Sequence, residues 1–197
     1  GAPGPNTFRR GIELHSMGRC NPVFFREFQK LVAEHDWAYI YNTVHLSTLD
    51  DYTANRKYLS DILKRTLFFE VNPAKFDGIV ESKFQHEFGY RYFEGIAAGC
   101  ILVGLENRNP NFEKLFPWED VLIELPTDSE EIVPFLLNLY EQKDRLRHIS
   151  RANTRGALLY HDFAYRWERT LAAAGLKPTE KLLQRREALF VEAERYA

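Results

Sequence analysis

The stretch HEFGYRYFEGIAAGC, residues 86–100, and the apolar run ILV at residues 101–103 decide the fold of this chain. Gly89 predicts a turn, the residues after it predict a short helix, and the apolar run predicts a buried strand. The start of such a helix offers unpaired backbone N–H groups and the positive end of the helix dipole to an anion. Glu94, inside the same helix, can accept hydrogen bonds from two hydroxyls of a ribose or a sugar.

Outside this unit, predicted strands alternate with predicted helices. The strands are expected at residues 11–18, 37–41, 66–71, 101–105 and 121–125. The other helices are expected from Asn21-Pro22 onward, at 52–65, at 111–116, from Asp128 or Ser129 onward, at 144–161, at 162–174 and at 179–196. The alternation predicts an α/β fold, a Rossmann-like parallel sheet with helices on both faces. Ligands of such sheets bind at the carboxyl ends of the strands, where Arg19, Asn72 and the helix start after Gly89 would meet.

Helical spacing of apolar residues predicts which side chains enter the core. The predicted inward sets are Phe24, Phe28, Leu31 and Val32; Tyr58, Leu59, Ile62 and Leu63; and Leu182, Leu183, Leu189 and Phe190 on the last helix. Trp167 is also expected in the core rather than as a stacking platform. Asp162 is expected to cap the helix that follows it rather than to form a catalytic dyad with His161.

Size and charge restrict the class of protein. The 197 residues suit one domain, and a net charge of −2 gives no argument for nucleic acid as a partner. The sequence contains neither an apolar run of about 18 residues that could span a bilayer nor a signal-peptide core. We therefore expect a cytoplasmic protein, with a peripheral position at the inner membrane as the alternative. Cys20 and Cys100 fit neither a disulfide framework nor a metal site and are expected to be buried thiols.

The central stretch resembles the donor-binding signature of GT-B glycosyltransferases of the Glu-x7-Glu class, through Phe88-Gly89, Glu94 and Ala97-Ala98-Gly99. Arg91-x-x-Glu94 also resembles the glycosyltransferase group 1 branch that includes the CgeB-like spore proteins. With weaker downstream matches, the resemblance covers roughly residues 60–173. It implies a hexosyltransferase-like enzyme that needs no cofactor and takes a nucleoside diphosphate sugar as its substrate. The acceptor would be the hydroxyl of a glycan, a lipid-linked group or a protein.

The resemblance also implies roles for individual residues. Arg19, His86 and Glu94 would be catalytic. The donor would be bound by Arg19, Phe88, Gly89, Tyr90, Arg91 and Glu94, without a metal ion. His86 stands where the family has its first Glu, so the retaining outcome typical of that class is implied only weakly. Arg26, Lys64, Lys75 and Lys83 are alternative cations for the diphosphate.

Ordinary structural roles compete with these assignments. Glu94 could be a solvated helix carboxylate, and its spacing from Arg91 also allows an ion pair within the helix. Gly89 could be a plain loop-to-helix glycine, and His86 a plain surface histidine. The functional roles are favoured for Glu94 and Gly89 because the surrounding motif supports them, and the two roles of Arg91 are equally weighted.

A GT-B enzyme has two Rossmann-like halves, and this chain has the size of one. Residues 1–10 are expected to be a linker or a cloning remnant, 11–175 the nucleotide-sugar-binding domain and 176–197 a C-terminal helix. An N-terminal acceptor domain would then be supplied in cis or in trans. The alternatives are a non-catalytic binding or interaction module, which could dock a partner through the last helix, and a sugar-nucleotide epimerase.

Overall fold

A computed structural model describes residues 10–42, 51–73, 76, 87–107 and 109–197. Five parallel strands form one sheet in the order β2-β1-β3-β4-β5. The strands are β1 (Ile12–Met17), β2 (Tyr39–Asn42), β3 (Thr66–Val71), β4 (Ile101–Gly104) and β5 (Leu122–Glu124). The parallel Rossmann-like sheet predicted from the alternation of elements is confirmed, and all five strands lie at or within a few residues of the expected positions.

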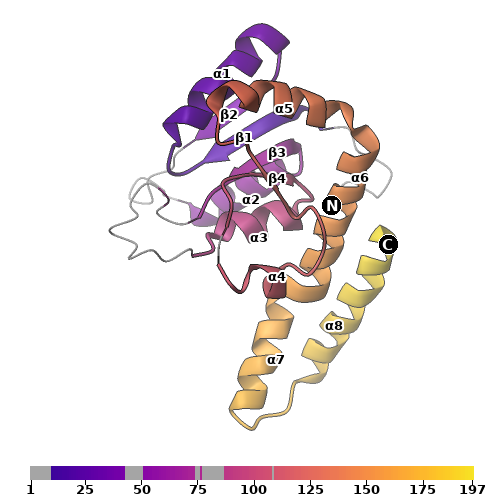
Figure 1. Ribbon diagram of the computed structural model, residues 1–197. Helices are drawn as coiled ribbons and strands as arrows, with labels where there is room; N and C mark the ends of the chain where they lie inside the picture. The colour runs from indigo at the N-terminus through magenta and orange to yellow at the C-terminus, as the bar shows by residue number, and fades with distance from the viewer. Residues whose placement is uncertain (1–9, 43–50, 74–75, 77–86, 108) are drawn as a thin grey trace.

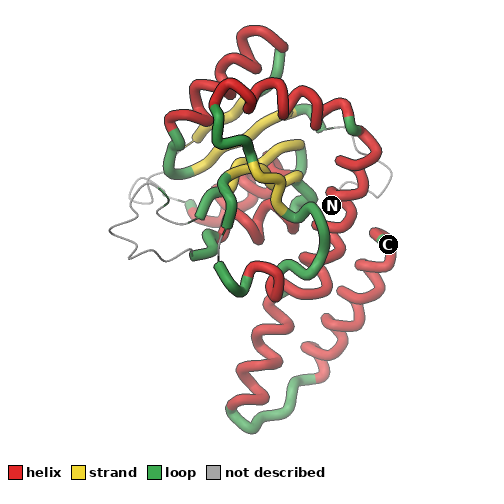
Figure 2. The backbone as a smooth tube through the Cα atoms, viewed as in Figure 1, coloured by secondary structure: helices red, strands yellow, loops and turns green. Residues whose placement is uncertain are grey.

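Helices cover both faces of the sheet, as Figures 1 and 2 show. On one face α1 (Pro22–His35) packs beside α5 (Ser129–Glu141), and on the other α2 (Tyr52–Leu63) packs beside α3 (Tyr90–Ala97). The core therefore has two parts. The α1/α5 side is built around Leu14, Phe28, Phe68, Ile101, Val103 and Leu136, and the α2/α3 side around Leu63, Phe69, Val71, Tyr92, Ile96 and Leu102.

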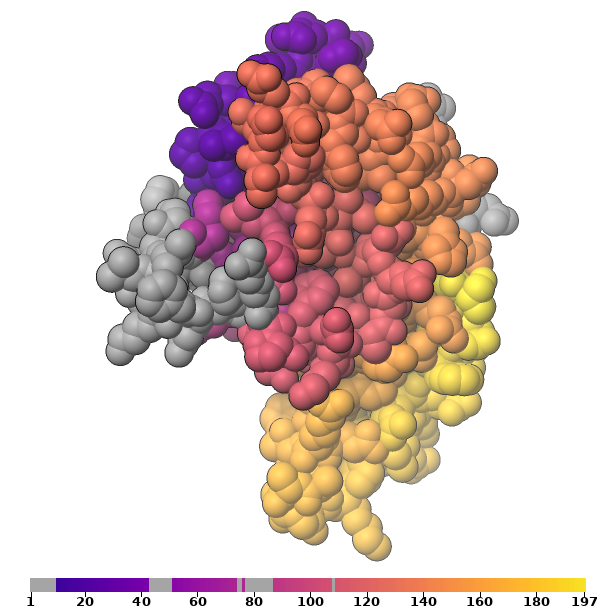
Figure 3. All heavy atoms as spheres, in the orientation of Figure 1, coloured from indigo at the N-terminus to yellow at the C-terminus, as the bar shows by residue number. Residues whose placement is uncertain are grey.

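The remaining helices belong to the C-terminal part of the chain, and the last two stand out from this three-layer arrangement. The short α4 (Phe112–Leu115) follows β4, and α6 (Lys143–Gly156) continues into a π-helical turn at Ala157–His161. After it, α7 (Phe163–Ala173) and α8 (Glu180–Ala193) form a hairpin that stands out from the body of the molecule, seen in ribbon form in Figure 1 and as filled volume in Figure 3. The chain then ends in a 3-10 turn at Glu194–Tyr196.

Capping residues set several helix ends where the sequence predicted them. Asn21 accepts hydrogen bonds from the backbone N–H groups of Val23 and Phe24 at the start of α1. Asp162 accepts from the N–H of Ala164 at the start of α7, and Gly175 ends that helix with a positive φ of 68°. The predicted capping role of Asp162 is therefore confirmed.

Some predicted core residues are instead exposed. Val32 on α1, Tyr58 on α2, and Leu183 and Phe190 on α8 all face solvent. Trp167 on α7 is 59% exposed, so the expectation that it enters the core is wrong. Trp167 lies on α7, in the hairpin that stands out from the body of the molecule, rather than on a helix that covers the sheet. Cys100 is a buried thiol as expected, whereas Cys20 is only half-buried, and both are free.

The strand order creates a switch point between β1 and β3. From β1 the chain passes to β2 on one side, and then returns across the sheet to β3 on the other. In open parallel sheets this reversal leaves a crevice at the carboxyl ends of the two strands, where ligands bind. We call this region the switch point.

Close packing holds α3 against the strands near the switch point. A Cβ atom at Gly95 of α3 would overlap the side chains of Leu102 and Phe69. Because glycine has no side chain, the helix can approach β3 and β4 closely. The sequence Glu94-Gly95 therefore places a carboxylate immediately beside the residue that fixes the height of the helix over the sheet.

Candidate functional site

The switch point brings together the ends of β1 and β3 and the start of α3. At the end of β1, Gly18 has a positive φ of 93° and turns the chain into Arg19, whose side chain is exposed. Asn72 follows β3 directly. The Arg19 loop, the Asn72 loop and the start of the central helix are the segments expected to meet at this edge. The Arg19 loop follows β1, Asn72 follows β3, and α3 begins at the same edge of the sheet.

The start of α3 differs from the start of the adjacent α2. Gly89 occupies the N-cap position and supplies no side-chain hydrogen bond. In contrast, Asp51 accepts hydrogen bonds from the N–H groups of Thr53 and Ala54 at the start of α2. The first N–H groups of an α-helix have no partner within the helix, so a start without a capping side chain leaves donors for another acceptor.

Glu94 lies between two arginines. Its Oε2 accepts a hydrogen bond from Arg91 Nη1 at 2.8 Å, and its Oε1 accepts one from Arg56 Nη1 at 2.8 Å. The ion pair that spacing allowed between Arg91 and Glu94 is therefore present. Arg56 comes from α2, and no local sequence pattern singles it out, because its partner is 38 residues away. Both oxygens of Glu94 are thus engaged by guanidinium groups.

Arg91 reaches from α3 toward the end of β1. A Cβ atom at Gly18 would lie 3.8 Å from Arg91 Nη2, so the guanidinium lies directly over this turn. Behind it, His15 is fully buried on β1 and hydrogen-bonded through Nε2 to Asn42 Oδ1 at 2.9 Å. Burial lowers the pKa of His15; the hydrogen bond to Asn42 partly opposes this shift, and the nearby charge of Arg91 adds to it. The imidazole is therefore neutral at pH 7, and the positive charge at this edge belongs to arginine.

A buried acid lies on the other side of the same strands. Glu70 on β3 accepts hydrogen bonds from Ser16 Oγ and, at 2.8 Å, from Asn72 Nδ2. Tyr39 donates to Ser16 at 3.0 Å. Burial raises the pKa of Glu70, and the two hydrogen bonds partly oppose this shift. Sequence reasoning missed Glu70; the only signal was one carboxylate inside the strand TLFFEV.

The other predicted site residues have distinct environments. The ring of Phe88 packs against Tyr92, Phe112 and Phe116, with centroids 5.8–5.9 Å apart, so this side chain anchors the loop before α3. Tyr90 is the first residue of α3 and is 79% exposed. His86 lies outside the described residues.

The alternative cations differ in position. Arg26 is exposed on α1, one turn beyond the start of that helix. Lys64 follows the last residue of α2, at the opposite edge of the sheet from the switch point. This position argues against a role in binding the diphosphate of the sugar donor. Lys75 and Lys83 lie outside the described residues.

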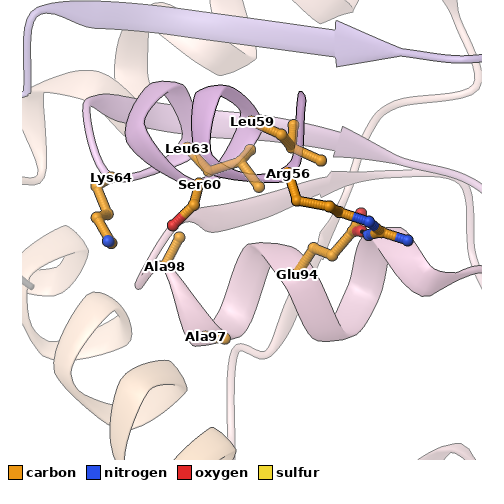
Figure 4. Close-up of a pocket in the computed structure, with 8 residues that line it drawn as sticks. All are labelled: Arg56, Leu59, Ser60, Leu63, Lys64, Glu94, Ala97 and Ala98. Carbon is orange, nitrogen blue, oxygen red and sulfur yellow. Dashed lines mark hydrogen bonds and ion pairs between the residues drawn. The ribbon is translucent and has the colours of Figure 1, made fainter. Parts of the chain in front are cut away.

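Two surface hollows can be compared with the position of these residues. The first is a groove of about 200 Å³ between α2 and α3, lined by Arg56, Leu59, Ser60, Leu63, Lys64, Glu94, Ala97 and Ala98. Figure 4 shows Arg56 reaching across the end of this groove to Glu94. A larger hollow of about 470 Å³ lies along α6 beside Trp118 and Tyr160, away from the switch point. We favour the smaller groove as part of the candidate site despite its size, because Arg56 and Glu94 meet there.

Neither metal ligation nor membrane insertion is indicated within the described part of the chain. No group of three or more His, Cys, Asp or Glu side chains there could hold a metal ion. Among the helices in that part, none has both the length and the apolar character needed to cross a bilayer. The chemistry of the described site is that of arginines, carboxyl groups and backbone N–H groups.

Comparison with known proteins identifies the family. None of the curated proteins matches the chain. A family model described as glycosyl transferase-like matches residues 52–172, which include α2, β3, α3, β4, β5 and the helices through most of α7. The matched segment contains Arg56, Glu70, Arg91 and Glu94. The match supports glycosyltransferase activity in general. The chain belongs to the glycosyl transferase-like family.

Proposed function

We propose that this chain is the donor-binding half of a GT-B glycosyltransferase of the CgeB-like branch. It would bind a nucleoside diphosphate sugar at the switch point and pass the sugar to an acceptor hydroxyl. The observation that carries the proposal is the convergence of the uncapped start of α3, Arg91 and Glu94, all within the segment that matches the family, beside the end of β1. A second Rossmann-like half, in cis or in trans, would supply the acceptor side.

The proposed reaction breaks the bond between the anomeric carbon and the diphosphate oxygen. The acceptor oxygen forms the new bond to that carbon and gives its proton to a base, and the diphosphate leaves with an added negative charge. Backbone N–H groups at Gly89–Arg91, with the guanidinium groups of Arg19 and Arg91, would stabilise this charge as it develops. His86, in the position of the family's first Glu, remains our candidate for a group beside the transferred sugar.

Calorimetry with UDP-, GDP- and ADP-sugars tests donor binding. We expect one of these to bind the wild-type chain and Glu94→Ala to weaken it at least about tenfold, because a charged hydrogen-bonding group is lost. Glu34→Ala is the matched control, since it removes an exposed carboxylate near the far end of α1. The proposal fails if the wild-type chain binds none of the three, or if Glu94→Ala and Glu34→Ala bind the donor equally well.

The exposed side chains of the α7–α8 hairpin favour one rival, an interaction module without catalysis. Phe163, Trp167, Leu183 and Phe190 are all exposed there. A stable complex with a partner chain, without any sugar transfer, would favour the module. Product analysis after incubation with the donor would separate transfer to an acceptor from epimerisation of the sugar.

A further inference from the structure

We infer that Arg56 and Arg91, held in place by Glu94, form a two-arginine clamp for the diphosphate of the donor. This step rests on the proposed function of the switch point as a donor site. It adds Arg56, which lies outside the motif, to the binding residues. It also gives Glu94 a positioning role, because its oxygens hold the two guanidinium groups.

The clamp is built from two helices. Arg56 lies one turn into α2, and Arg91 and Glu94 are the second and fifth residues of α3. Figure 4 shows the Arg56 side chain extending across the gap between the helices to Glu94, at the end toward which the strand arrows point. The carboxylate therefore joins the two helices at the carboxyl edge of the sheet.

Burial differs among the three side chains in a way that suits ligand binding. Glu94 is only 19% exposed, whereas Arg91 is 32% and Arg56 is 73% exposed. The carboxylate is thus largely covered by its partners, while the guanidinium groups remain accessible. The three groups together carry one net positive charge at neutral pH.

The guanidinium groups have donors left for an anion. Each carries five N–H donors in a planar fork, and the hydrogen bond to Glu94 uses one nitrogen, Nη1, of each. Arginine forks bind phosphate oxygens in pairs of parallel hydrogen bonds. Two forks on adjacent helices suit two linked phosphates better than one. We therefore expect the site to favour a nucleoside diphosphate over the monophosphate.

Calorimetry with UDP, GDP, ADP, their monophosphates and inorganic pyrophosphate tests the clamp. For the diphosphate that binds, we expect Arg56→Gln to weaken binding about 10- to 100-fold. The affinity of Arg56→Gln for the matching monophosphate should differ from that of the wild type by less than about threefold, because a single phosphate needs only one arginine fork. Lys57→Gln is the control because it removes the same charge from the next, also exposed, residue of α2. It should change diphosphate affinity less than about threefold.

A double-mutant cycle isolates the role of Glu94. If Glu94 holds Arg56 in position, Arg56→Gln should have less than about a threefold effect in a Glu94→Gln background. Independent roles, such as Glu94 binding only the ribose, would give the full effect of Arg56→Gln in both backgrounds and overturn the clamp. Arg56 is exposed, so the variant should fold, which circular dichroism and the unfolding midpoint check.

The outcomes separate the clamp from the proposed function. If the wild-type chain binds a nucleoside diphosphate but Arg56→Gln binds it as tightly as Lys57→Gln does, the clamp is wrong and donor binding stands. Equal affinity of the wild-type chain for the diphosphate and the monophosphate would also overturn the clamp. If none of the nucleotides or pyrophosphate binds, both the clamp and the proposed function fail.

Discussion

Ser16 on β1 donates a hydrogen bond to Glu70 on β3, and this bond joins the two strands at the switch point. Asn72 donates to the other oxygen of Glu70 and accepts a hydrogen bond from the N–H of Leu105, 3.2 Å away, which extends the connection to the end of β4. A single buried carboxyl group therefore ties together the ends of three neighbouring strands, directly behind the candidate donor site.

The raised pKa of Glu70 predicts how stability depends on pH. Because the carboxyl group is buried, the folded protein holds its proton more tightly than the unfolded chain does. This contribution to stability is fully present below the ordinary pKa of 4.5 and is lost as the pH rises toward the raised folded value. In Glu70→Gln, which cannot ionise, that loss should disappear.

Urea unfolding of the wild-type protein and Glu70→Gln at several pH values checks this. The free energy of unfolding of the wild type should fall relative to that of the variant as the pH rises from 4 toward 8. Taking the difference between the two proteins removes the titration of groups they share. A constant difference across this pH range would show that Glu70 does not titrate differently in the folded state.

Gly104 at the end of β4 has no room for a side chain. A Cβ atom there would overlap the carbonyl oxygen of Val71, and Asn72 Oδ1 would lie 3.2 Å from it. We expect Gly104→Ala to lower the free energy of unfolding by about 2 kcal/mol or more, because the ends of β3 and β4 must move apart. Gly11→Ala is the control, since nothing lies within 4 Å of its Cβ position, and it should stay within about 0.5 kcal/mol. Equal effects of the two substitutions would contradict the packing described.

Arg10 organises the opposite edge of the sheet. Its guanidinium donates to the carbonyl oxygens of Leu63, Thr66, Ala98 and Gly99 at 2.8–3.2 Å, and to the hydroxyl of Ser150 at 3.3 Å. Arg10→Ala would leave these acceptors without their shared donor.

We expect Arg10→Ala to cost about 3 kcal/mol in chemical unfolding. The exposed Arg65→Ala, which removes the same charge from the same edge, should cost less than about 0.5 kcal/mol. If both variants unfolded at the wild-type urea concentration, the hydrogen bonds of Arg10 would contribute nothing to stability.

Local patterns in the sequence predicted the elements and one part of the site. The strands, the caps at Asn21 and Asp162, and the pairing of Arg91 with Glu94 all depend on residues within a few positions of each other. Val32 and Tyr58 were misplaced because each lies roughly 80–100° around its helix from the middle of the buried stripe, where helical spacing alone does not separate core from surface.

The contacts that assemble the site depend on residues far apart in the chain. Arg56 meets Glu94 only because the chain crosses the sheet between β2 and β3, which brings α2 beside α3. Glu70 meets Ser16 for the same topological reason, since β1 and β3 are neighbours in space and 54 residues apart. Spacing in one sequence carries no signal for either pair. The place of the site could thus be predicted from the fold, but two of its charged partners could not.

The exposed Trp167 on α7 offers a direct test of the hairpin. Its indole is 59% exposed and lies one turn from Phe163, which is 69% exposed. Trp37, in contrast, is 7% exposed and stacks on Phe68 with ring centroids 5.7 Å apart. We expect Trp167→Ala to change the free energy of unfolding by less than about 0.5 kcal/mol. Trp37→Ala should cost about 3–5 kcal/mol, because it opens a cavity in the core.

Urea unfolding at two protein concentrations separates the explanations for any other result. A large cost of Trp167→Ala that grows with protein concentration would mean that the wild-type hairpin is covered by a second copy of the chain. A large loss of unfolding free energy in Trp167→Ala that does not depend on protein concentration would mean that the ring packs within the monomer. That result would contradict the exposed position of Trp167 described here. A small cost in both conditions leaves the α7 face free to meet a different partner, as the module hypothesis requires.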